Sequence, residues 1–505
     1  MDNAPLNLEQ TDKPEHAETI PTIHLKKGCA KPLHGGHPWV FLEAISRVDG
    51  KQAQSGDEVR VVDDRGGVLG RGFFSPASAI AVRILTRADA PITHHFFATR
   101  IDEAIRLRRE ILGLGSGLTT QSISATSVSP ESPAESLQQK DRLHLKLIDE
   151  QLEKVHAFAA QYGMDAAEES SELRLRRDAL LNLVKGTVPD GGIHRNAKTS
   201  EPRNVNTTAY RLVNSEGDGL GGLTVDVYGD YVAVQCGTAG MERRLSVVLD
   251  ILENRLKPKG ILDRSDARAR KLEKLDPPKF GALRGQEPNA PHLVLEHGVE
   301  LFCDLRSGQG QKTGLFLDQR ENRQRFASFA AGRRVLDVFS YSGGFAVHAM
   351  KAGARGITLI DSSEAALELA RVNMEHNKID DADLLNAEWP EGFKHLREAG
   401  QQFDLVVLDP PKFARTREDV SQALSGYRDL NAQAVRLLAP GGLLMTCSCS
   451  GNVSDSDFER AVAAGVRASG RRGLLLERRG ASPDHPIPPG FDQGRYLKCL
   501  LLQII

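Results

Sequence analysis

The chain has 505 residues, and at roughly 150 residues per domain this length predicts about three domains. Hydrophobic residues account for 40% and charged residues for 26%, with a formal net charge of −2. These values exclude a collagen-like or wholly disordered chain and a globally basic nucleic-acid coat protein. The six cysteines form no CxxC pair, which disfavours zinc fingers and disulfide frameworks. The apolar runs are too short to cross a bilayer and the N-terminus is acidic, so we expect a cytoplasmic protein.

Taken in chain order, the first 114 residues predict a tail, a β domain and a helix. Residues 1–20 are polar and acidic, which is typical of a disordered tail. Residues 21–92 predict a small β domain, because Gly and Pro separate the short β-rich segments IHLKKG, DEVRVVDD, GVLGRGFF and IAVRILTR. Apolar residues at helical spacing predict a linking helix over 93–114.

The next stretch interrupts this pattern. Residues 115–205 begin with a Ser/Thr/Pro-rich segment over 115–140 and continue with two helical patterns, 141–162 and 172–186. We therefore expect an insertion that is partly disordered and partly helical. Residues 206–310 return to β-rich segments around one helical pattern, which predicts a central α+β module.

The C-terminal region, 311–505, predicts an α/β fold. Strand-like runs alternate there with helical patterns at regular spacing: VLDVF, GITLID, ADLLN, FDLVVLD and GGLLMTCS. This alternation is typical of a parallel, doubly wound, Rossmann-like sheet. The last strand, RYLKCLLLQI, follows a hairpin-like region, so we expect it to form an antiparallel edge.

Acidic residues stand at the ends of three of these strands. Asp337 precedes a Gly343-Gly344 turn, Asp361 ends the second strand, and Asp409 opens Asp-Pro-Pro-Lys after the fourth. The acid after the second strand is placed to accept the hydroxyls of a ribose. A lone strand-end Asp is more often a helix cap or turn residue, but three in order indicate a ligand cleft. GxGxxG is missing at the first turn, which disfavours a nicotinamide oxidoreductase.

Several motifs resemble those of class I S-adenosylmethionine-dependent methyltransferases, and in particular the ribosomal large-subunit methyltransferase I family, which makes 5-methylcytosine. They are GGHPWVF, AYRLVNSEGDGLGGLTVD, DRSDARARK, KTGLFLDQRENR, VLDVFSYSGGFAVHAMKAGA, FDLVVLDPPKF and SCSG. The resemblance covers most of the chain outside the tail and 115–205. It implies an N-terminal PUA RNA-binding domain, a central α+β module and a C-terminal Rossmann-like methyltransferase domain.

The resemblance also implies S-adenosylmethionine as the cofactor. Asp361 matches the family's ribose-binding acid, and either Asn386 or Glu388 would contact the adenine. The segment before the first strand resembles one that closes over the cofactor. The implied cofactor-binding residues are Phe316, Asp318, Gln319, Asp337, Ser340, Gly343, Asp361, Glu388 and Asp409.

Two cysteines at the end of the fifth strand bear on the chemistry. Cytosine C5 is a weak nucleophile, and a thiolate that adds to C6 turns C5 into a strong one. Strand alternation places Cys447 and Cys449 on the same side, so periodicity does not choose between them. The family's SCS pattern selects Cys449 as the nucleophile, with Asp409 facing the base, and Cys447 is expected to pack in the core. The group that removes the C5 proton stays open.

RNA is the expected partner. The predicted contacts are Lys31 and Arg71 in the β domain, Arg264 in DRSDARARK, and Arg320 before the first strand. A solvated helix face is the alternative for the basic run. We expect no metal, since the chemistry needs none, and no membrane partner; a homodimer is a further prediction.

Two other functions are compatible with the sequence. Asp-Pro-Pro-Lys is similar to a motif of amino-group methyltransferases, which points to methylation of a guanine or another base nitrogen. That chemistry needs no nucleophile at Cys449. A non-catalytic RNA-binding assembly factor would be expected to lack Asp361, Asp409 or the cysteine, and all three are present.

Overall fold

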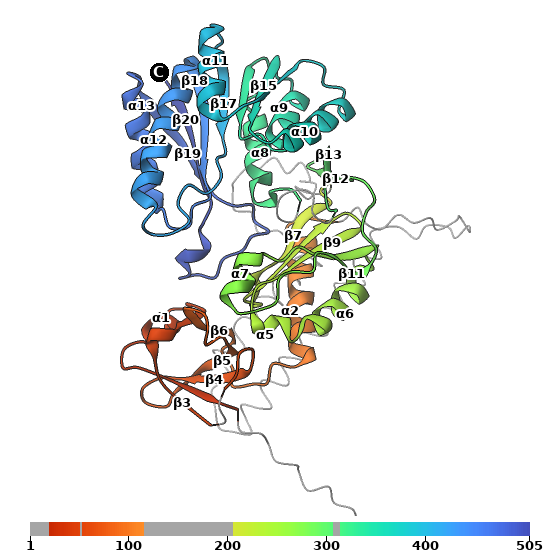
Figure 1. Cartoon of the computed structure of the whole chain (residues 1–505), viewed down its shortest axis with the longest axis vertical. Helices are drawn as coiled ribbons and strands as arrows, with labels where there is room; N and C mark the ends of the chain where they lie inside the picture. The colour runs from red at the N-terminus through yellow and green to blue at the C-terminus, as the bar shows by residue number, and fades with distance from the viewer. Residues whose placement is uncertain (1–19, 51–52, 116–205, 307–313) are drawn as a thin grey trace, which may run out of the picture. The chain divides into compact units, whose positions relative to one another are not determined.

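The computed structural model describes residues 20–50, 53–115, 206–306 and 314–505 (Figure 1). The predicted tail up to residue 19 and the predicted insertion from residue 116 lie outside the described residues. Within the described parts, the strands form sheets of six, five and seven strands and one two-stranded hairpin.

The N-terminal β domain consists of α1 (Lys31–His34), β1 (Thr22–Leu25), β2 (Trp39–Phe41), β3 (Ile45–Asp49), β4 (Glu58–Val62), β5 (Val68–Phe74) and β6 (Ile80–Thr86). Its six strands form one sheet in the order β2-β6-β5-β4-β1-β3. The four predicted β segments correspond to β1, β4, β5 and β6. Alternate side chains of these strands, such as Val59 and Val61, bury against Leu33 of α1 and form the core of the domain.

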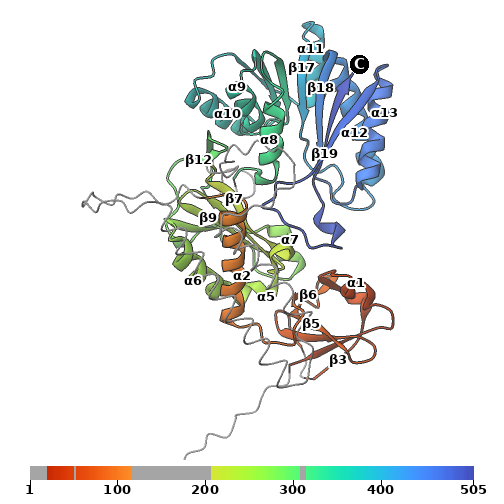
Figure 2. The ribbon, with the colours of Figure 1, turned by 180° about the vertical axis from the view of Figure 1, so that it is seen from behind.

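The central module contains β7 (Ala209–Asn214), β8 (Leu223–Tyr228), β9 (Tyr231–Cys236), β10 (Gly260–Asp263), β11 (Gly281–Gly285), α5 (Ala239–Glu242), α6 (Leu245–Leu256) and α7 (Ala267–Leu272). The predicted linking helix is α2 (His94–Arg106), which continues as a π-helical turn over Leu107–Ile111. Phe97 and Ile101 of α2 bury in one core with Val225 of β8 and Val248 of α6. The helix is therefore part of the central module, and it lies beside α6 (Figure 2).

The C-terminal sheet consists of β14 (Arg334–Val338), β15 (Gly356–Asp361), β16 (Ala382–Asn386), β17 (Phe403–Leu408), β18 (Leu438–Ser448), β19 (Gly473–Arg479) and β20 (Lys498–Ile504). The strand order is β16-β15-β14-β17-β18-β20-β19, and the first five strands are parallel. The predicted doubly wound sheet is confirmed. The predicted antiparallel edge is wrong in one respect: β20 lies inside the sheet, because β19 pairs with its far side.

Helices cover both faces of this sheet (Figure 1). They are α8 (Arg320–Ala327), α9 (Gly344–Lys351), α10 (Glu364–His376), α11 (Trp389–Glu398), α12 (Val420–Arg436) and α13 (Asp455–Ala468). Apolar side chains of α8, α9 and α10 bury on one face, and those of α11, α12 and α13 on the other. Since both faces are covered, polar side chains gather at the carboxyl ends of the strands, where the predicted cleft lies.

The hairpin of β12 (His292–Glu296) and β13 (Val299–Cys303) connects the central module to this domain. Leu301 buries in the same core as Val335 and Phe345 of the C-terminal domain. The Asn373 side chain on α10 accepts a hydrogen bond from the Phe302 N–H at 2.6 Å. The core of the C-terminal domain thus extends beyond the predicted boundary at residue 310.

Candidate active site

The loop after β14 has a strained backbone. Phe339 and Tyr341 adopt left-handed conformations, with φ of 63° and 48°, which non-glycine residues rarely do. Gly343 follows with φ of 76° and caps α9. Such strain persists only where surrounding contacts hold the backbone, and it is common at ligand sites.

Asp361 supplies those contacts from the neighbouring strand end. One of its carboxylate oxygens accepts the Tyr341 N–H at 2.8 Å, and the other accepts the Ser363 N–H at 2.9 Å. The loops after β14 and β15 are therefore fixed to each other, and the carboxylate is oriented at their junction. Asn386 lies directly opposite Asp361 on β16, and the exposed Glu388 precedes α11. Both adenine candidates thus lie on the same side of Asp361, and the choice between them stays open.

Gly343 of this loop packs closely against neighbouring elements. A Cβ atom at this position would lie 3.2 Å from the Ala370 Cβ and 3.4 Å from a methyl group of Leu359. The free space at Gly343 is therefore filled by α10 and β15. The glycine is required by its positive φ and by packing against these two elements.

Asp337 and Ser340 carry unsatisfied polar atoms. In the described parts of the chain, the buried Asp337 Oδ1 and Ser340 Oγ atoms have no hydrogen-bond partner, while Asp337 Oδ2 accepts the Ala346 N–H at 3.1 Å. Burial, followed by the nearby charge of Asp409, raises the pKa of Asp337 to about 8. Buried polar groups are rarely left unpaired, so these two atoms fit a ligand that brings hydrogen-bond donors, such as an ammonium group.

The segment before α8 is held over this loop. The Arg323 guanidinium forms a buried double hydrogen bond to Glu296 at 2.6 Å, and it also donates to the Phe316 carbonyl at 3.0 Å. Burial alone would raise the pKa of Glu296, but Arg323 holds it well below its usual range. The Phe316 ring packs edge-on against Tyr341, with ring centres 5.3 Å apart. A buried ion pair therefore fixes the segment predicted to close over the cofactor.

Gln319 and Asp318 place this segment against the rest of the site. The Gln319 side-chain amide donates to Asp409 at 2.9 Å and accepts from Asn322 at 2.7 Å. The Tyr496 hydroxyl donates to the Asp318 carboxylate at 2.6 Å. Gln319 and Asp409 are thus in direct contact, although 90 positions separate them in the chain.

The two candidate cysteines differ in their surroundings. Cys447 is fully buried and lies opposite Cys499 on β20. The contact with the Cys499 thiol, followed by burial, raises the pKa of Cys447 well above its usual value. Cys449 lies just past the end of β18, is only half-buried, and has its Sγ atom 3.8 Å from the Pro410 carbonyl oxygen. Cys449 therefore lies beside the Asp409-Pro410 turn, as a nucleophile facing the same base as Asp409 would.

The residues predicted to contact RNA differ in their exposure to solvent. Lys31 is exposed at the start of α1. Arg71 is buried and pairs with Glu58 and Asp89. Arg320 is fully buried and forms two hydrogen bonds to Asp484, at 2.8 and 3.0 Å. These arginines direct their charge to acids inside the protein, and their phosphate contacts stay a prediction. Asp484 lies 164 positions from Arg320, so the basic residue alone did not indicate this pair.

Arg264 shows the same pattern with a different partner. It is buried, and its guanidinium donates to the Arg306 carbonyl at 2.9 Å. This hydrogen bond holds the backbone shortly after β13. Of the four predicted RNA contacts, Lys31 alone is an exposed side chain.

Sequence reasoning missed several residues that shape the site: Glu296, Asn322, Arg323, Tyr341, Tyr496 and Lys498. The sequence offered one indication of these residues, namely a charged residue next to an apolar run. Glu296 ends one such strand and Lys498 begins another. Such residues are almost never fully buried unless they have partners.

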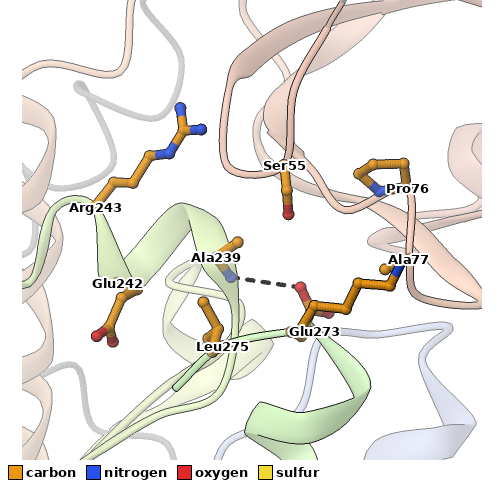
Figure 3. A pocket seen from close by; sticks show the side chains of 9 residues that line it. Ser55, Pro76, Ala77, Ala239, Glu242, Arg243, Glu273 and Leu275 are labelled. Atoms are coloured by element: carbon orange, nitrogen blue, oxygen red, sulfur yellow. Dashed lines mark hydrogen bonds between the residues drawn. The ribbon is translucent and has the colours of Figure 1, made fainter.

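A separate pocket of roughly 430 Å³ lies between the β domain and the central module (Figure 3). Its lining contains none of the predicted site residues and consists of Ser55, Pro76, Ala77, Ala239, Glu242, Arg243, Glu273, Lys274 and Leu275.

No helix in the described parts of the chain is long and apolar enough to cross a membrane. Those parts also hold no group of three His, Cys, Asp or Glu side chains arranged as metal ligands.

Comparison with known families agrees with this fold and site. A family model described as S-adenosylmethionine-dependent methyltransferase matches residues 274–502, and a PUA-like domain model matches residues 23–87. The chain is thus an S-adenosylmethionine-dependent methyltransferase with an N-terminal PUA-like domain. The unpaired Asp337 and Ser340 atoms and the oriented Asp361 carboxylate fit the amino-acid and ribose parts of this cofactor.

Curated relatives identify the family within the class of S-adenosylmethionine-dependent methyltransferases. The protein named ribosomal RNA large subunit methyltransferase I in Aeromonas salmonicida is 31% identical, over 95% of this chain and 98% of the relative. The proteins of the same name in Shewanella denitrificans and Klebsiella pneumoniae are 33% and 32% identical, each over 95% of this chain. The chain belongs to the ribosomal RNA large subunit methyltransferase I family.

Solved structures share the fold. An S-adenosylmethionine-dependent methyltransferase from Streptococcus mutans is 18% identical and aligns with a TM-score of 0.67, over 96% of this chain and all of the other. A methyltransferase complexed with S-adenosylhomocysteine gives a TM-score of 0.68 at 19% identity, with the same coverage. At this identity the likeness establishes the fold alone.

Proposed function

We propose that this enzyme methylates C5 of a cytidine in large-subunit ribosomal RNA through a covalent adduct between Cys449 and C6. The position of Cys449 carries the proposal: the half-buried thiol lies beside Pro410, next to Asp409, whereas Cys447 is sealed in the sheet. Membership of the family named for ribosomal RNA supports the substrate. The PUA-like domain and the exposed Lys31 support RNA binding.

The residues of the site would act in sequence. The Cys449 thiolate adds to C6, which forms an Sγ–C6 bond and makes C5 nucleophilic. Bound S-adenosylmethionine supplies an electrophilic methyl group, so that a C5–CH₃ bond forms as the sulfonium–CH₃ bond breaks. A base then removes the C5 proton, and the Sγ–C6 bond breaks to release methylated RNA. Asp409, held by Gln319, hydrogen-bonds the edge of the base during these steps.

The sequence Asp409-Pro410-Pro411-Lys412 favours a second candidate. It is similar to the motif of amino-group methyltransferases, so the alternative is transfer to a nitrogen of guanine or of another base. That reaction needs no thiol nucleophile. Cys449 therefore separates the two candidates, and methyl transfer by the native protein separates both from an assembly factor without catalysis.

The test combines two single variants with analysis of the product. Cys449→Ala should abolish methyl transfer while S-adenosylmethionine binding, measured by calorimetry, is retained. Cys447→Ala is the matched control and should keep activity. RNA containing 5-fluorocytidine should trap a covalent complex with the native enzyme, because fluorine does not leave as a proton does. Methylated nucleosides are identified by mass spectrometry; an active Cys449→Ala enzyme would transfer support to the base-nitrogen reaction.

A further inference from the structure

A lysine is buried next to the candidate nucleophile. Lys498 begins β20 and is only 3% exposed. Its Nζ atom donates to three backbone carbonyls: Ser450 at 2.8 Å, Val453 at 2.9 Å and Tyr496 at 2.9 Å. Two of these acceptors belong to the loop that directly follows Cys449 and leads into α13.

The three acceptors establish the protonation state of this lysine. An ammonium group has three N–H donors, one for each carbonyl, whereas a neutral amine has two donors and a lone pair that would face the third oxygen. Burial lowers the pKa of Lys498, whereas the three carbonyl acceptors favour the charged form. None of the three acceptors carries a negative charge. A buried cation with neutral partners is costly, so its energy depends strongly on any anion that forms nearby.

The loop held by Lys498 is also fixed on its other side. The Ser450 hydroxyl accepts the Ala414 N–H at 3.2 Å and lies 3.1 Å from the Tyr427 hydroxyl of α12. The backbone directly after Cys449 is therefore anchored to β20, to α12 and to the chain after β17. These anchors hold the Cys449 side chain at the Pro410 turn.

The charged and titratable groups around Cys449 and its neighbours Lys498 and Tyr427 come from four elements. Asp409 and the exposed Lys412 follow β17, Tyr427 lies on α12, Asp455 begins α13, and Lys498 begins β20. Asp409 opposes ionisation of the thiol, and Asp455 is exposed and therefore screened by solvent. The favourable charges are Lys412 and Lys498, and Lys498 alone of these two is buried and fixed by hydrogen bonds.

We propose that Lys498 is a positioning residue for Cys449, which fixes the loop after the thiol and stabilises the thiolate by its buried charge. The inference rests on the proposed function, because it assigns Lys498 to the nucleophile named there. A thiolate at Cys449 would in turn neutralise a cation whose hydrogen-bond partners are all neutral. A larger fraction of the thiol is thereby ionised at neutral pH.

The test measures the rate of Cys449 alkylation by iodoacetamide as a function of pH, with the modified residue assigned by mass spectrometry. Native Cys449 should titrate below the value near 8.5 of a free cysteine. Lys498→Met removes both charge and donors, and Lys498→Gln removes the charge but keeps two N–H donors. Lys394→Met, at an exposed position on α11, is the matched control and should reproduce the native profile.

The outcomes separate charge from structure. If the charge acts, both variants raise the apparent pKa of Cys449 by about one unit, which slows alkylation at pH 7 about tenfold. If only the hydrogen bonds matter, Lys498→Gln keeps the native profile, and the electrostatic part is overturned. A native Cys449 that titrates above about 8.5 overturns it even if neither variant folds. An active Cys449→Ala enzyme would remove the proposed function while the alkylation profiles still decide the effect of Lys498 on the thiol.

Discussion

The Gln319 side-chain amide donates a 2.9 Å hydrogen bond to the carboxylate of Asp409. Its orientation is fixed by the next residues in the same series, because Asn322 donates to the Gln319 oxygen at 2.7 Å and Arg479 donates to the Asn322 oxygen at 2.9 Å. Each of these three hydrogen bonds is donated in the direction of Asp409. The position of that carboxylate therefore depends on β19, which lies at the far edge of the sheet.

Replacing Gln319 tests this chain. Gln319→Leu leaves Asp409 without its oriented donor, and loss of a hydrogen bond to a charged group costs about 1.5–3 kcal/mol. We expect kcat to fall roughly ten- to a hundredfold, measured by single-turnover methyl transfer. Gln324→Leu, at an exposed position on the following helix α8, should leave kcat unchanged. A native kcat in Gln319→Leu would show that Asp409 is oriented without it.

Asp337 should couple cofactor binding to proton release. Its pKa is raised to about 8, first by burial and then by Asp409, so the carboxyl is protonated in the free enzyme at pH 7. An ammonium ligand favours the ionised form, so binding of S-adenosylmethionine at pH 7 should release about one proton. Calorimetry in buffers of different ionisation enthalpy measures this number. Asp337→Asn should bring it close to zero, and an unchanged value would assign the proton to another group.

The same residue makes a prediction about stability. The folded-state pKa of Asp337 lies above that of an unfolded aspartate, near 3.9, so the unfolded chain loses this proton first as the pH rises. The contribution of Asp337 to folding therefore becomes less favourable between about pH 4 and pH 8. Asp337→Asn should flatten the dependence of the urea midpoint over this range. A profile that stays parallel to that of the native enzyme would contradict the assignment.

The buried Arg320–Asp484 pair should be a major stabilising contact. Asp484→Ala removes both hydrogen bonds of this pair and leaves the buried Arg320 charge with the contact to Glu321 at 3.2 Å; breaking a buried ion pair typically costs about 3–5 kcal/mol. Burial raises the pKa of Asp484, but Arg320 and His485 hold it below its usual range, so this contribution is present at neutral pH and is lost as the medium becomes acidic. Urea unfolding at pH 7 measures the loss. Glu398→Ala, which breaks an exposed pair on α11, should leave the midpoint unchanged.

Asp361 has two tasks that its variants can separate. Asp361→Ala removes the predicted ribose acceptor and also frees the left-handed Tyr341 backbone, so cofactor affinity should fall by more than the roughly ten- to hundredfold expected from charged hydrogen bonds alone. Asp361→Asn keeps an oxygen that can accept the Tyr341 N–H and should bind better than Asp361→Ala. Titration calorimetry compares the two, and equal affinities would mean that the tie to Tyr341 does not contribute.

The sequence predicted the parallel strands and the acids at their ends because both depend on local pattern. Buried parallel strands are continuous apolar runs, and Asp337, Asp361 and Asp409 mark where three of them stop. The place of β20 could not be predicted in this way, because strand order depends on pairing between distant segments. The burial of Arg71 and Arg320 was missed for the same reason: Asp89 and Asp484, which neutralise them, are identified only by the fold.

The position of β20 inside the sheet has a consequence for synthesis of the chain on the ribosome. β18 and β19 are made first, yet neither has its full set of neighbours until residues 498–504 have left the exit tunnel and inserted between them. Lys498 arrives with that same segment. A nascent chain that already carries Asp409 and Cys449 thus lacks, until residues 498–504 insert, both the strand that completes its sheet and the buried cation that holds the loop after Cys449.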